Sequence, residues 1–299
     1  MRKSVLALAA VAALGSATVV HAAATASASL GPLVITLIDL DPTDSVAPAV
    51  TFSTVYYGYG TYAYSQASNT SPYEYAWDQQ WGPDSFDPVS SSAATSMSGG
   101  WSAVTGSGSP GGTVVSAGGY ANGTMDLAPF GYQYSTFTAY ANAPYSSYTS
   151  FTLTSNTLML ISAASTLSTG VTASFDPSTS YQYEYANAST YMQISGPGAS
   201  GNGSQSASDT ASVSIGSAPI YDNACGYGYC YGPASASDTR TLAVSFVNAS
   251  GGDLSGWFYS QSYTNGYSYA QVIPEPGSYA LMLAGLGVVG ALARRRRRG

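Results

Sequence analysis

Apolar and aromatic residues alternate with Ser, Thr and other polar residues along most of the chain. The alternation is broken at short intervals by Gly, Pro, Asn and Asp, and no segment between residues 25 and 272 repeats apolar residues at the spacing of an amphipathic helix. Period-two alternation interrupted by turn residues predicts many short antiparallel strands. We therefore predict that residues 25–271 form one all-β domain, an antiparallel β-sandwich with a jelly-roll-like arrangement of two sheets.

The same alternation gives the expected positions of individual strands. The runs that fit best lie at residues 33–40, 50–57, 132–140, 147–154, 157–167, 171–175, 180–194, 241–247 and 254–263. Residues 155–156 fit a tight connection, and Ser250-Gly251-Gly252 and Asn265-Gly266 fit hairpin turns. The low-complexity stretches 90–112 and 195–209, rich in Ser and Gly, are predicted to be loops.

Residues 1–24 have the three-part layout of a secretory signal peptide. Arg2 and Lys3 precede an apolar run that extends to Val20. Small residues then recur at the positions that a signal peptidase requires, and we expect cleavage between Ala22 and Ala28. This segment predicts a signal helix and export by the Sec machinery.

Residues 272–299 form a second processing segment. Pro274, Glu275 and Pro276 precede an apolar stretch at residues 278–293, which predicts a short transmembrane helix. The stretch ends in five arginines, Arg294, Arg295, Arg296, Arg297 and Arg298. By the positive-inside rule these arginines stay cytoplasmic and stop transfer through the membrane. The two prolines favour an extended peptide before the helix, which a protease or transpeptidase can bind.

In these three parts the C-terminal segment resembles the PEP-CTERM sorting signal of Gram-negative bacteria. The resemblance covers residues 272–298 and implies recognition by an exosortase, a membrane enzyme with a cysteine nucleophile. It implies transient anchoring in the inner membrane, processing near Pro274-Glu275-Pro276, and transfer to the cell surface or extracellular matrix. It further implies an association with exopolysaccharide and biofilm.

The distribution of charge separates the two ends from the body. The chain has 15 acidic and 8 basic residues, but Arg240 is the only basic residue within 25–271, and the one histidine is His21. The body has 14 carboxylates, because Glu275 lies in the tail, so one positive charge against 14 negative charges gives −13. One Arg cannot supply a nucleic-acid interface. Without His, the body cannot form a Ser-His-Asp or Cys-His centre or a His/Cys zinc site.

Tyrosine is the most unusual residue choice of the body. The chain has 26 tyrosines, and several groups of them alternate with other residues. Alternation places the rings on one face of a strand, where tyrosine can pack half-buried with a hydrated hydroxyl. The functional alternative is a platform on which sugar rings stack. Its best anchors would be the tryptophans Trp77, Trp81, Trp101 and Trp257.

The two cysteines and the acidic clusters suggest further features. Cys225 and Cys230 enclose four residues, which in an exported protein favours a structural disulfide. Asp39, Asp41 and Asp44 are weak candidates for a calcium site, because oxygen ligands suit Ca²⁺, although Asp-rich segments also form ordinary turns.

We expect an exported, exosortase-processed surface or matrix protein without catalytic activity or a cofactor. Alternatives are a glycan-binding module that uses Tyr and Trp faces, and a carbohydrate-active enzyme that uses paired carboxylates. Glu74 and Glu184 are the only glutamates of the body. Alternation places both opposite their neighbouring tyrosines, and we interpret their position as a solvated outer face.

Overall fold

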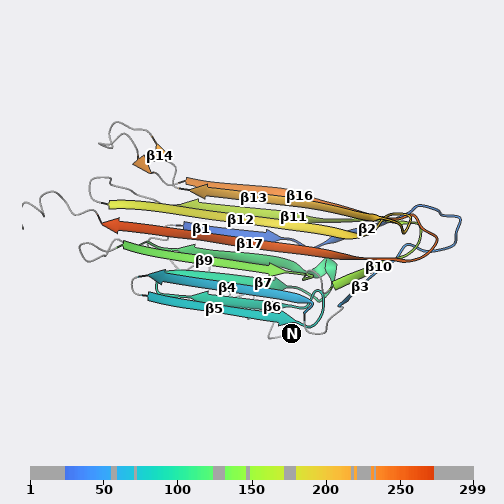
Figure 1. The fold of residues 1–299 in the computed structure, drawn as a ribbon, viewed down its shortest axis with the longest axis horizontal. Coiled ribbons are helices and arrows are strands. Elements are labelled where there is room, and N and C mark those ends of the chain that lie inside the picture. The colour runs from blue at the N-terminus through green and yellow to red at the C-terminus, as the bar shows by residue number, and fades with distance from the viewer. Residues whose placement is uncertain are drawn as a thin grey trace, which may run out of the picture.

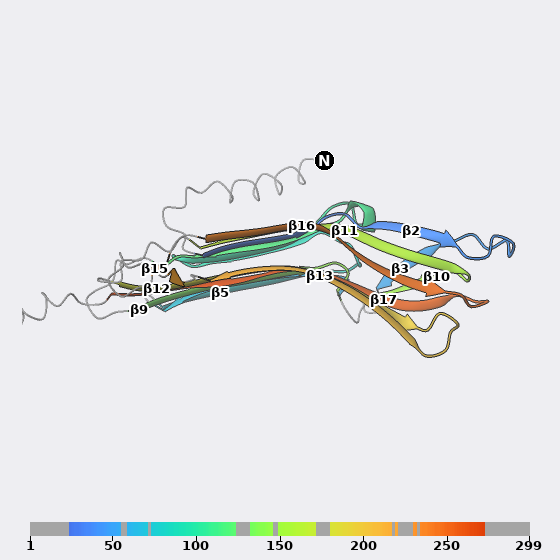
Figure 2. The same cartoon turned by 90° about the horizontal axis from the view of Figure 1, so that it is seen from above.

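The computed structural model describes residues 24–54, 59–70, 73–123, 132–145, 149–171, 180–216, 219–220, 230–231 and 234–272. These residues form two large sheets in which every strand pair is antiparallel. The sheets stack face to face as two elongated layers (Figures 1 and 2). The predicted antiparallel β-sandwich is therefore confirmed for the described residues.

Seven strands form the first layer, called sheet 1. Their order is β16-β11-β1-β8-β7-β6, and β2 also pairs with β11. The bounds are β1 (Ala24–Leu30), β2 (Val34–Asp39), β6 (Val89–Ala94), β7 (Ser98–Thr105), β8 (Val114–Ala121), β11 (Thr157–Val171) and β16 (Ala234–Asn248). A short 3-10 helix, η1 (Pro110–Gly112), precedes β8.

Eight strands form the second layer, sheet 2, which faces the viewer in Figure 1. Their order is β13-β12-β17-β9-β4-β5, with β10 placed between β17 and β3. The bounds are β3 (Val50–Thr54), β4 (Thr61–Thr70), β5 (Tyr73–Gly82), β9 (Tyr132–Asn142), β10 (Thr149–Leu153), β12 (Ser180–Pro197), β13 (Ser204–Gly216) and β17 (Leu254–Val272). A separate pair joins β14 (Pro219–Ile220) to β15 (Cys230–Tyr231).

One of the three turn predictions is confirmed and two are wrong. Residues 155–156 do connect two strands, but β10 lies in sheet 2 and β11 in sheet 1, so the chain crosses between layers there. Residues 250–252 likewise join β16 to β17 across the layers, and the predicted hairpin is wrong. Asn265-Gly266 forms no turn, because β17 runs through it. Gly266 faces inward, and a Cβ there would lie 2.5 Å from Cε1 of Phe137.

Both predicted loops are wrong as well. Residues 90–112 contain most of β6 and all of β7, and residues 195–209 contain the end of β12 and the start of β13. Only residues 198–203 separate β12 from β13, and Pro197 pairs with Ser204. These strands are rich in Ser, Ala and Gly. On β7 most of these residues are buried, whereas the serines of β13 are exposed on its outer side.

The interior has two halves of different composition. The small-residue half lies between β1, β7 and β8 of sheet 1 and β4, β9 and the C-terminal part of β17 in sheet 2. Its buried positions are mostly Ala, Ser and Gly, among them Ala26, Ala63, Ser65, Ser102, Ala117, Ala139, Ala141 and Ser262. The two layers lie close together there and separate toward β2 and β10 (Figure 2).

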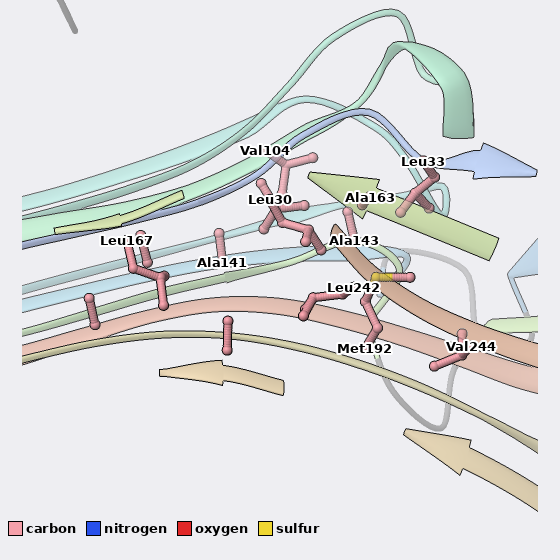
Figure 3. Close-up of a cluster of buried hydrophobic side chains, with 14 of the residues drawn as sticks. Leu30, Leu33, Val104, Ala141, Ala143, Ala163, Leu167, Met192, Leu242 and Val244 are labelled. Atoms are coloured by element: carbon pink, nitrogen blue, oxygen red, sulfur yellow. The ribbon is translucent and has the colours of Figure 1, made fainter. Parts of the chain in front are cut away.

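The large-residue half fills the wider end of the sandwich. Its fully buried side chains include Phe151, Leu153, Met159, Ile161, Phe246 and Phe258. The Phe151 and Phe246 ring centroids are 4.9 Å apart, in an edge-to-face arrangement. Figure 3 shows side chains from both layers between the sheets, such as Leu167 of sheet 1 and Met192 of sheet 2.

The two flanking helices predicted from the sequence lie outside the described residues, and so do residues 273–299. Within the described part of the chain, no helix has the length and apolar character needed to cross a membrane.

Candidate functional site

The outer surface of sheet 2 carries most of the described aromatic side chains. Along β4, β5, β9, β12 and β17, one set of alternate residues faces sheet 1 and the other set faces away from it. The outward set, which we call the tyrosine face, contains Tyr62, Tyr64, Tyr73, Tyr75, Trp77, Trp81, Tyr134, Tyr140, Tyr183, Tyr185, Tyr191, Trp257, Tyr259, Tyr263, Tyr267 and Tyr269. The inward positions beside them on β4, β9, β12 and β17 are mostly Ala, Ser and Gly. These small residues let the layers lie close together, and the inward ring of Phe137 packs against Gly119 and Gly266.

The tyrosine face has no charged side chain in its described part. The outward residues that are not aromatic are Ser, Thr, Asn and Gln, among them Gln66, Ser68, Gln79, Thr136, Thr138, Asn187, Gln193, Gln261 and Asn265. The body as a whole is strongly acidic. The carboxylates therefore lie elsewhere, and the face combines apolar ring surface with neutral hydrogen-bonding groups.

Strand register arranges these outward residues in rows that run across the sheet. One row contains Asn187, Asn265, Thr138, Gln66 and Trp77, each paired with the next. We call it the amide row. The next outward row on one side contains Tyr263, Tyr140 and Tyr64. The row on the other side contains Tyr185, Tyr267 and Tyr75. Outward rows follow one another at roughly 7 Å along the strands.

Ring contacts hold the tyrosines of the face together. The centroids of Tyr64 and Tyr140 are 5.1 Å apart, and those of Tyr140 and Tyr263 are 6.4 Å apart. On the other side of the amide row, Tyr267 lies 5.6 Å from Tyr185 and 5.7 Å from Tyr134. Offset and tilted ring pairs at these separations are favourable. The face is therefore a packed layer of rings that presents a fixed surface.

Exposure is highest at the edge of the sheet. β5 is the last strand of sheet 2, and none of the described strands pairs with its outer edge. Tyr73 is 81% exposed, Tyr75 is 52% exposed and Trp77 is 55% exposed. Because large aromatic side chains are seldom exposed together, such a cluster marks a binding surface more often than a structural one.

The hydroxyl groups of the face are neutral donors at physiological pH. The Tyr64 hydroxyl donates to Oε1 of Gln66 at 2.7 Å, and the Tyr62 hydroxyl donates to Oε1 of Gln79 at 3.1 Å. Burial and, to a smaller extent, a hydrogen bond with Tyr183 raise the pKa of Tyr267 to about 12. Burial also raises the pKa values of Tyr62 and Tyr259. The face therefore stays uncharged over the physiological pH range.

The four tryptophans suggested as sugar anchors do not share one surface. Trp77, Trp81 and Trp257 belong to the tyrosine face, and the Trp81 ring packs 4.1 Å from the Tyr62 ring. Trp101 lies on β7 and faces outward from sheet 1, where its ring covers Gly118. The sequence showed which face of a strand carries the rings, but not which sheet the strand joins.

Both glutamates lie on the side of their strands that faces sheet 1, which corrects the expected outer face, and Glu74 keeps contact with solvent at the edge of the sheet. Glu184 is fully buried on the inner side of β12. Glu74 accepts hydrogen bonds from the Ser96 backbone N–H at 2.6 Å and from Nδ2 of Asn69 at 3.2 Å. The two glutamates occupy one row, with β17, β9 and β4 between them. Four strand spacings separate them by roughly 19 Å, whereas paired catalytic carboxylates lie within about 10 Å of each other.

The aspartates suggested for calcium are engaged in turns. Oδ1 of Asp39 accepts from the Asp41 backbone N–H at 2.9 Å, and Oδ1 of Asp41 accepts from the Thr43 backbone N–H at 3.1 Å. Oδ2 of Asp44 accepts from Nδ2 of Asn156 at 2.7 Å, and this hydrogen bond lowers the pKa of Asp44. In the residues that the structure describes, no three acidic, His or Cys side chains form a group that could hold a metal ion.

A separate cavity of about 540 Å³ opens where the two sheets diverge. Ile35, Phe52 and Phe86 form part of its apolar lining, and Asp84 and Asp87 contribute carboxylates. Oδ2 of Asp87 is engaged by the Asp84 backbone N–H at 3.1 Å. This hydrogen bond gives one of the two carboxylates a structural role in the loop.

Two other predicted sites cannot be placed. Cys225 lies outside the described residues, so its disulfide with Cys230 stays a prediction. Pro274, Glu275, Pro276 and the terminal arginines also lie outside them. The amide row was not foreseen. Asn and Gln at alternate strand positions were the only indication, and the pairing register was needed to show that they form a row.

The described residues thus define a two-layered antiparallel β-sandwich with one uncharged aromatic face. Residues 272–298, which begin at the last residue of β17, match the family of the PEP-CTERM protein-sorting motif. The chain therefore carries this sorting motif, as its sequence predicted. The motif implies export, a membrane-anchored sorting signal before processing, and an exosortase as processing partner. A comparison with curated proteins finds no match.

Proposed function

We propose that this protein is a non-catalytic component of the cell surface or extracellular matrix that binds polysaccharide through the tyrosine face. The sorting motif supports delivery to the outside of the cell. The observation that carries the binding role is the joint exposure of Tyr73, Tyr75 and Trp77 on a face without charged side chains.

The chemistry of sugars fits this face. A pyranose ring has C–H surfaces that pack against aromatic rings, and hydroxyls that both donate and accept hydrogen bonds. Tyrosine offers both kinds of contact in one side chain. Asn and Gln side chains provide a donor and an acceptor side by side. A repeating polymer can touch many such groups at once, so individually weak contacts add up.

A carbohydrate-active enzyme has less support. Its two candidate glutamates lie four strand spacings apart on the side of sheet 2 that faces sheet 1, and Glu184 is fully buried. An activity assay of the exported protein on the polysaccharides that it binds separates the two proposals. Turnover that disappears when Glu74 and Glu184 are both changed to Gln would establish the enzyme.

Delivery and binding are tested separately. For delivery, the protein is followed in cell fractions with its sorting motif intact and with Pro274, Glu275 and Pro276 changed to Ala. We expect the intact protein at the surface or in the medium, and the variant at full length in the inner membrane. Identical fractionation of both would refute exosortase processing.

For binding, the exported protein is passed over immobilised polysaccharides. The double variant Tyr75→Ala/Trp77→Ala should lose retention. Trp101→Ala, which removes a tryptophan from the opposite surface of the sandwich, should keep it. Equal retention of both variants would show that the tyrosine face does not bind sugar.

A further inference from the structure

We infer that the ligand of the tyrosine face is an uncharged polysaccharide, and that its chain lies across the strands along the amide row toward Trp77. This inference rests on the proposed function, because it names the class of polymer and its direction on the same face. Three features of the face support it.

The first feature is charge. An acidic polysaccharide needs cationic partners for its carboxylates, since burying an anion without a partner is costly. Residues 25–271 contain a single basic residue, Arg240, and it lies on β16 of sheet 1. Its guanidinium is 3.9 Å from Asp209 and 3.8 Å from Asp238. The net charge of −13 repels a polyanion further.

The acidic residues of the body do not favour binding of a cationic polymer at this face either. The tyrosine face has no carboxylate among its described outward side chains. Glu74 and Asp78 lie on β5 beside the exposed rings, but alternation places both on the opposite side of the strand. A cationic sugar would find aromatic rings there without an acidic partner. Neutral rings and amides therefore favour a neutral polymer.

The second feature is the amide row itself. Asn187 and Asn265 face each other on adjacent strands, and Nδ2 of Asn187 donates to Oδ1 of Asn265 at 3.1 Å. Gln66 accepts the Tyr64 hydroxyl through Oε1, which orients its Nε2 group as a donor to a ligand. Thr138 adds a hydroxyl between them. The row thus presents amide or hydroxyl groups on β12, β17, β9 and β4, and Trp77 on β5.

The third feature is the arrangement of rings beside the row. Tyr263, Tyr140 and Tyr64 follow one side, and Tyr267 and Tyr75 stand on the other. Trp77 ends the row on the edge strand and is 55% exposed. From Asn187 to Trp77 the row spans roughly 19 Å, four strand spacings, enough for several sugar rings. A chain along it would bind amides with its hydroxyls and stack its last rings on Trp77.

The test uses the exported protein and three soluble probes, namely a neutral glucan, a polyuronate and a cationic polyglucosamine. Affinity electrophoresis is run at low and at high ionic strength. We expect retardation by the neutral glucan alone, unchanged by salt, because contacts without charge are not screened. Binding of the polyuronate or the polyglucosamine that weakens with salt would overturn the neutral class. The proposed function would survive that outcome if Tyr75→Ala/Trp77→Ala abolished the binding.

Variants of the amide row test the direction of the chain. Gln66→Ala and Asn265→Ala should each weaken neutral glucan binding by about tenfold, the effect of losing one or two hydrogen bonds. Thr166→Ala, an exposed position on the outer side of β11, is the matched control and should change nothing. If both row variants bound normally while Trp77→Ala did not, binding along the amide row would be refuted, and binding by the tyrosine face would still be supported. Unaltered binding by all of these variants would refute both.

Discussion

The two halves of the interior hold the same pair of sheets together by different means. In the large-residue half, Phe, Met, Leu and Ile fill a wide gap and contribute the free energy of apolar burial. In the small-residue half the layers approach so closely that a Cβ at Gly100 of β7 would lie 3.1 Å from the Thr138 carbonyl oxygen and 3.2 Å from that of Gln66. Less apolar area is buried there, and close contacts between the two layers contribute to stability in its place.

Hydroxyl groups join the layers directly in the small-residue half. Ser262 of β17 donates to the Val115 carbonyl of β8 at 2.8 Å, and Ser102 of β7 donates to the Tyr64 carbonyl of β4 at 3.0 Å. Where two sheets lie this close together, buried serines stabilise the interior through hydrogen bonds between the layers. Rings have little room inside this half, where Phe137 packs against Gly119 and Gly266, and most aromatic side chains of sheet 2 lie on its outer surface.

The largest expected effect is in the large-residue half. Phe246→Ala removes a fully buried ring that packs edge-to-face on Phe151, and should cost about 3–5 kcal/mol in the free energy of unfolding. Ala139→Gly, the matched deletion in the small-residue half, should cost about 1 kcal/mol, because it removes one methyl group and frees the backbone. Urea unfolding of the exported protein measures both values. Equal losses would contradict the division of the interior.

A smaller loss follows from adding volume to the small-residue half. A Cβ at Gly119 of β8 would collide with the Phe137 ring, which Gly266 confines on another side. Gly119→Val should therefore cost about 1–3 kcal/mol through overpacking. The same substitution at Gly251, where a Cβ meets nothing within 4 Å, is the control. The double variant Gly119→Ala/Phe137→Leu should lose less free energy of unfolding than the sum of the two single variants, because Leu leaves more room for the added Cβ. Losses that simply add would contradict the contact between these two residues.

Local alternation was enough to predict some of the strands that carry apolar or aromatic residues. β2, β9 and β11 lie within one to four residues of their expected bounds, because each shows a clear period of two. β7 and β13 were missed, since their Ser, Ala and Gly residues are also typical of loops. Pairing with a neighbouring strand, β8 for β7 and β12 for β13, distinguishes the two uses of this composition, and the composition alone does not reveal that pairing.

For the candidate site too, local alternation predicts only part of the arrangement. Alternation correctly separated Glu184 from Tyr183 and Tyr185, but it could not say which side was buried, and the larger, more apolar side chains proved to be outside. Likewise Trp77 and Trp101 both lie at outward positions of a strand, but they occupy different sheets. Sheet membership is set by pairing over long sequence separations, and a single sequence does not reveal it.

Hydroxyl contacts between the layers should have a moderate effect. Ser262→Ala leaves the Val115 carbonyl without this hydrogen bond in a dry interior, and should cost about 1 kcal/mol. Ser212 is exposed on the outer side of β13, so Ser212→Ala is the control and should stay within about 0.5 kcal/mol of the unaltered protein. Urea midpoints compare the two. A Ser262→Ala variant as stable as its control would show that the hydroxyls do not join the layers.

The smallest effect at neutral pH concerns the tyrosines that cover the small-residue half, and it grows only in alkali. The pKa of Tyr267 is raised to about 12 in the folded protein by burial and by its hydrogen bond with Tyr183. A tyrosine in the unfolded chain has a pKa of about 10. A raised folded-state pKa means that the stability contributed by Tyr267 is fully present below about pH 10 and is lost as the pH rises through about 12. The Tyr267→Phe variant cannot ionise at this position, so its alkaline unfolding midpoint should move to higher pH while its stability at pH 7 changes little. Tyrosinate absorbance followed together with circular dichroism measures this shift, and complete ionisation near pH 10 with the fold intact would show that the face is not packed.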